Sequence, residues 1–428
     1  MDNRNSRGSQ MNRRVFLGRA GLVGAGALVA PGVLAACGSS SKSTASNPGG
    51  TKAGGGSVGA GLVVGSLRPL TGLLASSYSP LYMNAQLALQ EINAAGGILG
   101  KPLSLKNVDD TGSPAGEPQA VKQLQSDGIR FVIGPTGDSN TEAALAVLTV
   151  NKMISCGFVQ SDFAGDASKY PYSYHPYFDT TEEGDQMAQY MVQQLGIKKV
   201  AYLEENSALG QNVLGPMKAT LAKYGATLVS TQEYSITDNN FEPFVTNMRN
   251  AGAQGIIATL GNVPNTVSFY NALIQVGWFP PTVSHAAPLL TAVTSKTWPS
   301  ELLKNVYCAT LKNYSYPANG QPPQTNVAFV NKLKQIPGFS SGGSPSAPFY
   351  DFLKILAMVI NDIKSTDVSS VKKALDGVRN YAGMNGTITF TPTNHNGIGI
   401  SDCTIVTAAS ASDPRSMGGY FFQQAPGL

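Results

Sequence analysis

The sequence predicts an α/β protein made of two modules, each with a parallel sheet. Its 428 residues exceed what one ordinary core needs, and an apolar content of 42% excludes a disordered chain. Short apolar runs that end at Pro or Gly alternate with segments whose apolar residues recur every three or four positions. This alternation is typical of right-handed βαβ units, and therefore of parallel sheets.

The first module is predicted to begin with a strand at 62–67, where an apolar run ends before Pro69. The helix that follows carries apolar residues spaced by four, four and three positions and stops at Gly96, namely Leu81, Ala85, Leu89 and Ile92. The cycle then repeats with a strand at 103–108, a helix around 120–124 and a strand at 131–134.

An aromatic and Pro-rich passage at 170–178 separates the two modules, and we interpret it as packing at a domain boundary rather than as a ligand site. The second module is predicted to contain helices around 187–195, 214–224, 241–248 and 267–274, with strands at 200–203 and 255–260. Ligands bind beyond the carboxyl ends of parallel strands, so two such edges facing each other would form a site between the modules.

The N-terminus is interpreted as an export signal. Arg13 and Arg14 precede an uncharged run at 20–36, which ends in Leu-Ala-Ala before Cys37. This order resembles a bacterial twin-arginine signal peptide (1–36) with a lipobox, so we expect cleavage before Cys37 and lipidation of that residue. The alternative is an uncleaved membrane anchor, but the run is short and broken by Gly compared with the roughly 20 residues of a spanning helix.

Residues 37–57 are rich in Ser, Gly and Thr, which predicts a flexible tether between the lipidated cysteine and a folded body. The segment at 54–59 satisfies both the G-x-G-x-x-G and the G-x-S-x-G patterns. Both motifs require a preceding strand and a following helix, whereas here a linker precedes and a strand follows. We therefore predict neither a dinucleotide site nor an esterase nucleophile.

Charge and composition exclude several further classes. Five of the arginines and one acid lie in the first 36 residues, and the remainder has 25 basic and 25 acidic residues, so no cationic surface for nucleic acid is predicted. His175, His285 and His395 are too far apart for metal-ligand spacing, and no metal or cofactor is expected. Cys156, Cys308 and Cys403 allow at most one disulfide, and for the first two we favour buried free thiols.

Several segments together resemble the leucine/isoleucine/valine-binding protein family, whose members are type I periplasmic solute-binding components of ABC importers. They are Pro-Leu-Thr-Gly at 69–72, the run at 85–100 with Glu-Ile-Asn-Ala-Ala-Gly-Gly-Ile, Asp109-Asp110 and Val-Ile-Gly-Pro at 132–135. The resemblance covers roughly 58–426. It implies two Rossmann-like lobes joined by a three-crossing hinge that close on a small molecule, with lobe 1 at 58–178 and 307–390 and lobe 2 at 179–306 and 391–428.

The resemblance also implies a monomer without enzymatic activity that lies at the extracytoplasmic face of the cell membrane and delivers its ligand to ABC permease subunits. A ligand sensor that signals to a membrane partner is the alternative. A secreted hydrolase is less favoured, because no nucleophile motif in context, metal cluster or carboxylate pair supports it.

Amino-acid-binding members of the family hold the α-carboxylate with a serine loop and a threonine, and the ammonium with an acid of the second lobe. Here Asp138 stands where the serine would fall, Val159 lies nearest the threonine, and the acid aligns near His285. The usual second-lobe tyrosines fall near Leu209 and Gly261. A buried ammonium needs a paired carboxylate, so a zwitterionic ligand is less favoured than a small, partly apolar or aromatic carboxylate or amide.

Asp138 has two interpretations, which remain open at this point: it caps a helix that starts at Ser139, or it contacts the ligand. Amino acids remain the family default as ligand. The candidate ligand-binding residues are Ser77, Tyr78, Asp138, Ser139, Phe158, Val159, Gln160, Ser161, Asn206, Leu209, Asn262 and His285.

Overall fold

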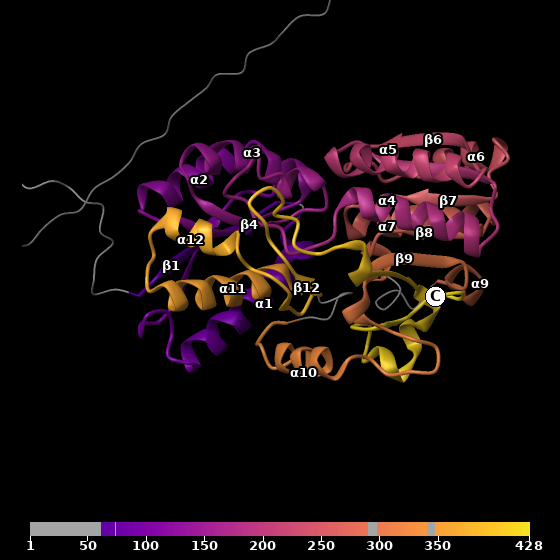
Figure 1. Ribbon diagram of the computed structural model, residues 1–428. Helices are drawn as coiled ribbons and strands as arrows, with labels where there is room; N and C mark the ends of the chain where they lie inside the picture. Colours follow the sequence, from indigo (N-terminus) through magenta and orange to yellow (C-terminus); the bar gives the residue numbers. More distant parts are fainter. Residues whose placement is uncertain (1–60, 73, 290–297, 340–346) are drawn as a thin grey trace, which may run out of the picture. The chain divides into compact units, whose positions relative to one another are not determined.

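The computed structural model describes residues 61–72, 74–289, 298–339 and 347–428 (Figure 1). The predicted signal peptide, Cys37 and the tether lie outside the described residues. Two separate sheets with parallel strands form the framework of the described body, as the alternation of strands and helices predicts.

The first sheet has the strand order β2-β1-β3-β4, and all of its pairs are parallel. Its strands are β1 (Val63–Arg68), β2 (Ser104–Asp109), β3 (Phe131–Thr136) and β4 (Ile154–Phe158). The helices that belong to this lobe are α1 (Ala75–Ala94), α2 (Glu117–Ser126), α3 (Asp138–Val150), α10 (Gln324–Leu333), α11 (Pro348–Ile363) and α12 (Val368–Leu375).

Helices cover both faces of this sheet (Figure 1). On one face α1 and α11 pack around Val64 and Ile133, and on the other α2 and α3 pack around Leu67 and Val132. Successive residues of a strand point to opposite faces, so a strand buried on both sides reads as a continuous apolar run. This is why the run at 62–67 predicts β1.

The second sheet has the order β13-β9-β8-β7-β5-β6, and β13 is antiparallel to β9 while the other pairs are parallel. Its strands are β5 (Lys199–Glu205), β6 (Thr227–Tyr234), β7 (Gly255–Ala258), β8 (Thr282–Ser284), β9 (Val306–Leu311) and β13 (Cys403–Thr407). Around it lie α4 (Thr180–Gln189) with the π-helical η2 (Tyr190–Gln194), α5 (Ala208–Lys223), α6 (Glu242–Asn250), α7 (Val263–Val276) and α9 (Ser300–Leu303). Helices α4 and α5 pack on one face and α6 and α7 on the other.

Short elements complete the fold. They are the strands β10 (Ser315–Tyr316), β11 (Tyr381–Ala382), β12 (Thr387–Ile388) and β14 (Phe422–Gln423), and the 3₁₀ turns η1 (Asp162–Gly165), η3 (Lys312–Tyr314), η4 (Ile400–Asp402), η5 (Ala408–Ser412) and η6 (Pro414–Ser416). None of the described helices combines the length and hydropathy that crossing a bilayer requires.

The chain returns to the first lobe later than the sequence analysis places it. We expected lobe 1 to resume at residue 307, but Tyr307 lies in β9 and pairs with Val283 and Thr407 of the second sheet. The return follows β10, and α10 then packs against α1. An apolar strand can join either sheet, and only its long-range partners decide which one.

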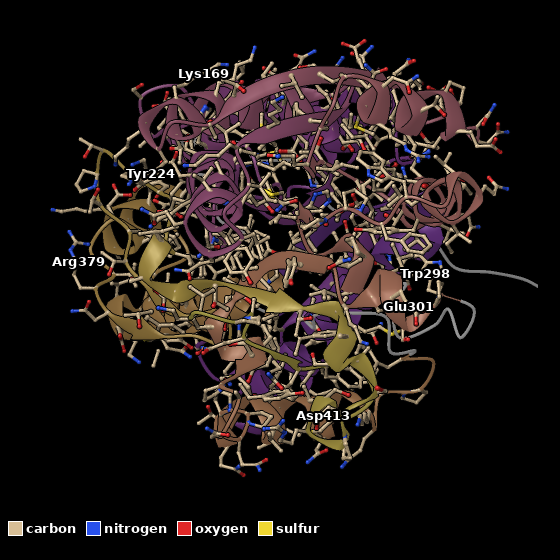
Figure 2. The ribbon with its side chains drawn as sticks, turned by 90° about the vertical axis from the view of Figure 1, so that its right-hand side faces the viewer. Lys169, Tyr224, Trp298, Glu301, Arg379 and Asp413 are labelled. Atoms are coloured by element: carbon tan, nitrogen blue, oxygen red, sulfur yellow. The ribbon has the colours of Figure 1, made fainter. Side chains whose placement is uncertain are left out.

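The aromatic passage between the modules is packing, as predicted. Tyr174, Tyr177 and Phe178 are buried in the core that α1 and α11 share with the first sheet. Exposed charged side chains such as Lys169 and Arg379 project outward (Figure 2).

Cys156, Cys308 and Cys403 are free and buried, and burial raises the pKa of the Cys308 thiol to about 12. The expectation of buried free thiols at Cys156 and Cys308 is thus confirmed.

Candidate functional site

The carboxyl edge of the first sheet carries a polar cluster centred on Asp138. Strands β3 and β4 are neighbours, so the segments that follow them meet at one edge. Gly137, with φ 91°, turns the chain from β3 into α3, and Asp138 is the first residue of that helix. Its Oδ1 accepts hydrogen bonds from Gln160 N (3.1 Å), Ser161 N (2.6 Å) and Ser161 Oγ (2.5 Å).

These bonds contradict one of the two interpretations of Asp138 that the sequence leaves open, the helix cap. The helix begins at Asp138 itself with Gly137 as its N-cap, and the carboxylate binds the loop after β4 instead of the helix amides. The N-cap interpretation is therefore wrong. Asp138 is 8% exposed, and its Oδ2 is not among the atoms that the three bonds engage.

The carboxyl edge of the second sheet carries Glu205, which the sequence analysis did not select. Glu205 is the last residue of β5 and is 6% exposed. Its Oε2 accepts hydrogen bonds from Gly261 N at 2.8 Å and from Tyr234 Oη at 3.0 Å. Gly261 follows the adjacent strand β7, and the approach is so close that a Cβ there would lie 2.4 Å from Oε2. Only glycine fits at this position without displacing the carboxylate.

His285 stands next along the same edge, after β8. Its Nδ1 accepts a hydrogen bond from Leu260 N at 3.3 Å, which places the proton of the neutral ring on Nε2. Burial lowers the pKa of His285 to about 4. The second edge therefore presents a carboxylate and a neutral imidazole.

Several hydrogen bonds connect this edge and its helices to the first lobe, and three of them lie close to Asp138 or Glu205. Asn212 Nδ2 on α5 donates to Ser161 Oγ at 2.9 Å, and Tyr78 Oη on α1 donates to Gly261 O at 3.4 Å. Gln160 Nε2 donates to Glu183 Oε2 on α4 at 3.1 Å. We use "the junction" for the place defined by Tyr78, Asp138, Gln160, Ser161, Glu183, Glu205, Asn212 and Gly261.

Carboxyl groups dominate the electrostatics of the junction. Burial raises the pKa of Asp138 to about 6 against the opposing hydrogen bonds of Ser161 and Gln160, and the charge of Glu205 adds to the rise. Burial and the charge of Asp138 raise the pKa of Glu183 well above its usual range. Burial, Glu205 and Asp138 also raise the pKa of the Tyr78 phenol. Within the described ranges, no Lys or Arg forms an ion pair with these acids.

The junction brings together some of the residues that the sequence singles out. Tyr78, Asp138, Gln160 and Ser161 take part in its hydrogen bonds. Phe158 is half-buried beside it, with its ring 6.0 Å from that of Tyr78 and 5.1 Å from that of Tyr177. Ser139 is half-buried next to Asp138 on α3, and the side chain of Ser77 lies outside the described residues.

Other candidates serve the fold. Val159 is 1% exposed and packs in the core between the first sheet and α3. Asn262 caps α7, where its Oδ1 accepts from Asn265 N at 2.8 Å. Leu209 is buried on α5. Asn206 is exposed, and its backbone N–H donates to Tyr234 O.

The second lobe places an acid at the junction, although not where the family acid aligns, near His285. Glu205 reaches the junction from the end of β5. The available signal was two acids, Glu204 and Glu205, directly after the apolar run at 200–203. Glu183 and Asn212 lie within helices and carry no comparable signal. No three His, Cys, Asp or Glu side chains of the described part of the chain are placed to hold a metal ion.

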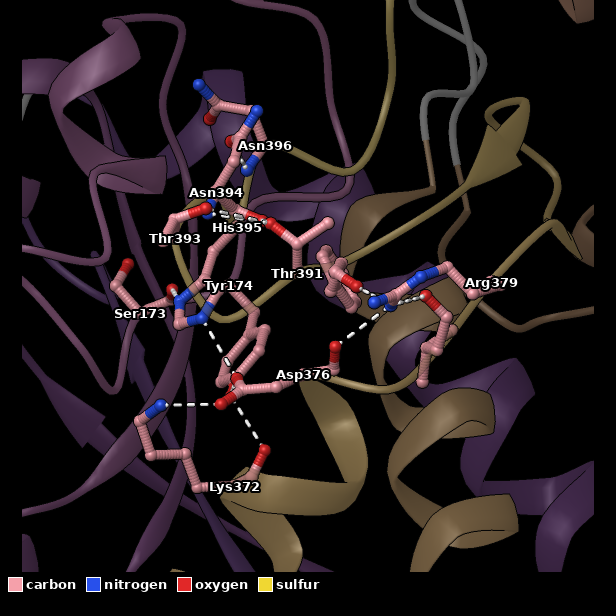
Figure 3. Close-up of polar contacts among 12 residues, drawn as sticks. Ser173, Tyr174, Lys372, Asp376, Arg379, Thr391, Thr393, Asn394, His395 and Asn396 are labelled. Carbon is pink, nitrogen blue, oxygen red and sulfur yellow. Dashed lines mark hydrogen bonds and ion pairs between the residues drawn. The ribbon is translucent and has the colours of Figure 1, made fainter.

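Two of the chain segments that connect the lobes lie side by side. Residues 173–175 and 394–396 are held together by Gly397 N to His175 O (2.8 Å) and His175 N to His395 O (3.0 Å). Figure 3 shows how His395 is fixed there, with Nδ1 at 2.7 Å from Ser173 O and Nε2 at 3.0 Å from Asp376 Oδ1. Asp376 also accepts from Tyr174 Oη at 2.6 Å and pairs with Lys372 at 2.8 Å. This cluster ties both segments to α12.

Two α/β lobes whose sheets present polar carboxyl edges to one junction are the architecture of a bilobal binding protein. The comparisons agree: the family model described as "Periplasmic binding protein" matches residues 61–413. The chain therefore belongs to the periplasmic binding protein family and has the type I fold that the resemblance implies.

Individual relatives are distant. The chain is 29% identical over 195 residues to "Leu/Ile/Val-binding protein homolog 3" of Brucella melitensis. The alignment covers 46% of this chain and 53% of that protein. The chain thus spans about half the length of the curated relatives that it matches first.

Two solved structures share the fold, both with a TM-score of 0.67 and both covering 81% of this chain. One is the branched-chain amino acid transporter substrate binding protein LivJ of Streptococcus pneumoniae in complex with isoleucine, at 19% identity over 96% of that chain. The other is a solute binding protein of an ABC transporter from Rhodopseudomonas palustris in complex with 3,4-dihydroxybenzoic acid, at 18% identity over 92% of that chain.

Proposed function

We propose that this protein is the substrate-binding component of an ABC importer and captures a small solute at the junction of its two lobes. The observation that carries the proposal is the meeting of two carboxyl edges, where the nearly buried acids Asp138 and Glu205 form no ion pair with another described residue. Membership of the periplasmic binding protein family supports it. The proposal contains no chemical step, only binding and release.

Closure of the lobes is the proposed mechanism. The junction is joined by hydrogen bonds such as Asn212 to Ser161 and Tyr78 to Gly261, each of which contributes only about 0.5–1.5 kcal/mol net. A solute that touches both edges adds contacts only in the closed form, so it shifts the population toward closure by its differential affinity. The permease subunits then distinguish the loaded protein by its shape.

The proposal includes a membrane tether. The twin arginines and the Leu-Ala-Ala-Cys motif at 34–37 support export through a twin-arginine route and lipidation of Cys37 at the extracytoplasmic face. We expect Cys37→Ala to move the protein from the membrane fraction to the soluble fraction. Persistent membrane association of this variant would contradict the lipid anchor.

For the ligand, the sequence favours a small, partly apolar or aromatic carboxylate or amide, with an amino acid as the family default. Related folds are solved with isoleucine and with 3,4-dihydroxybenzoic acid. The rings of Tyr78 and Phe158 supply an aromatic wall for such a body. A free carboxylate next to Asp138 and Glu205 would be repelled, so the amide is the better of the two sequence-based classes.

The test is ligand-induced stabilisation together with compaction of the full chain. We expect one class among branched-chain amino acids, aromatic acids, amides and amines to raise Tm by several degrees. A ligand at a concentration of 100 times its Kd stabilises the folded protein by about 2.7 kcal/mol. The same ligand should reduce the radius of gyration in small-angle X-ray scattering. A panel without any stabilising member, or stabilisation without compaction, would contradict solute capture by closure.

A further inference from the structure

The junction holds a carboxylate from each lobe. Asp138 comes from the start of α3 and is 8% exposed, and Glu205 comes from the end of β5 and is 6% exposed. Tyr78 links them: its Oη donates to Gly261 O, Gly261 N donates to Glu205 Oε2, and a Cβ on Gly137, the residue before Asp138, would lie 3.9 Å from the Tyr78 Oη. The charge of Glu205 also adds to the raised pKa of Asp138. The two acids therefore face one shared region.

A third carboxyl group belongs to the junction. Glu183 is 1% exposed, and its Oε2 accepts from Gln160 while its Oε1 has no hydrogen-bond partner among the described residues. The charge of Asp138 contributes to its raised pKa, so the three groups share one electrostatic environment. A buried polar atom without a partner is uncommon in a native structure and calls for a ligand or an ordered water.

Within the described ranges, the protein supplies no positive charge to balance these acids. No Lys or Arg forms an ion pair with them, and the neighbouring His285 is held neutral by burial. The hydrogen bonds that the carboxylates accept come from Ser161, Gln160, Gly261 and Tyr234, which are all neutral donors. Buried charges are normally paired, and these acids form no ion pair with another described residue, so a positively charged ligand would supply the partner.

We propose that the ligand of this site carries a positively charged nitrogen group, an ammonium or an amidinium, which binds between Asp138 and Glu205. This inference rests on the proposed function, namely that the junction is the solute site. Each lobe provides one anionic partner, so the cation is fully paired only when the lobes meet, and its charge drives closure. The aromatic wall of Tyr78 and Phe158 suits both an apolar body and a cation above a ring face.

Carboxylates, zwitterionic amino acids and organic amines should therefore bind this site with different affinities. A carboxylate ligand would bring a further negative charge to Asp138 and Glu205. A zwitterionic amino acid would gain one ion pair and suffer one repulsion, because the described junction has no cation for its carboxylate. An organic amine gains the pairs without the repulsion, so it should bind most tightly.

The experiment compares matched probes by isothermal titration of the full chain at pH 7.5. One series is 3-methylbutylamine, leucine and 4-methylpentanoate, which share an isobutyl body, and the other is benzamidine, benzamide and benzoate. We expect 3-methylbutylamine and benzamidine to bind at least about tenfold more tightly than the other members of their series, since a hydrogen bond to a charged group contributes about 1.5–3 kcal/mol.

Variants test the two acids directly. Asp138→Asn and Glu205→Gln keep the shape and an acceptor oxygen, and each should weaken benzamidine binding by about tenfold or more while benzamide binding changes little. Glu142→Gln on α3 is the matched control, because it removes the same charge from an exposed position of the same helix as Asp138. Circular dichroism of each variant checks that the fold is retained.

The results separate this inference from the proposed function. Tighter binding of leucine, 4-methylpentanoate, benzamide or benzoate than of the matching cation would overturn the charge assignment and leave solute capture intact. Failure of both cations to bind at millimolar concentration would also overturn it. If no probe of either series binds and the wider panel gives no stabilisation, the solute-binding function itself fails.

Discussion

Glu117 should make the stability of this protein depend on pH in a way that one substitution removes. It is the first residue of α2, it is fully buried, and neither of its carboxyl oxygens has a hydrogen-bond partner among the described residues. Burial, with a contribution from the charge of Asp110, raises its pKa to about 10. The folded protein therefore keeps Glu117 protonated at neutral pH.

The sign and size follow from proton linkage. The unfolded chain loses this proton above its ordinary pKa of 4.5, while the folded chain holds it up to about 10. Between these values the folded state binds more protons, so stability is fully present below pH 4.5 and falls as pH rises, by about 1.4 kcal/mol per pH unit. At pH 7 the loss is about 3 kcal/mol.

Glu117→Gln removes the ionisable group and keeps the shape. We expect the variant to match the wild type in urea unfolding near pH 4.5 and to be more stable by about 3 kcal/mol at pH 7, with a difference that grows with pH. Glu142→Gln, an exposed change of the same charge, should show no such growth. A difference for Glu117→Gln that stays constant from pH 5 to pH 8, or a loss of stability throughout, would refute the buried protonated carboxyl.

Three further predictions concern the junction and the connecting segments. Asn212→Ala removes the hydrogen bond to Ser161, so ligand affinity should fall about threefold to tenfold while the unfolding midpoint changes little. Unchanged affinity would show that this bond does not stabilise the closed form. Because the pKa of Asp138 is about 6, cation binding should weaken as pH falls below 6 and this carboxyl protonates, and equal benzamidine affinity at pH 5 and 7.5 would count against its role. Asp376→Ala deprives His395 and its neighbours of their acceptor, so the free energy of unfolding should drop by about 2 kcal/mol or more, and a drop below about 0.5 kcal/mol would show that water replaces the carboxylate.

Local patterns predicted the elements of the fold well. The apolar run at 62–67 and the spacing of Leu81, Ala85, Leu89 and Ile92 indicate β1 and α1 within a few residues. Such signals depend on residues a few positions apart, which every helix or strand must place on a common face. The assignment of β9 failed because strand partners lie far away in the sequence, and its apolar residues fit either sheet.

The candidate site was predicted in part. Gln160 and Ser161 follow the end of β4, where parallel sheets place their ligands, so their position indicated them. Asp138 follows β3 and was indicated by the resemblance, because it stands where the family serine falls. Glu205 does not occupy the position that matches the family acid, so the resemblance did not indicate it. Glu205 nevertheless stands at the end of a strand, β5. Val159 and Asn262 lie near such ends too, but one packs into the core and the other caps a helix.

The sequence by itself determined the class of this protein: alternating strands and helices, two modules, and motifs that resemble a family of solute-binding proteins. Only the tertiary structure decided which charges meet, because Asp138 and Glu205 are 67 positions apart and become neighbours through the packing of two separate sheets. Periodicity reports the face on which a side chain lies. The charge of a binding site depends on which edges face each other, and that is a property of the folded chain alone.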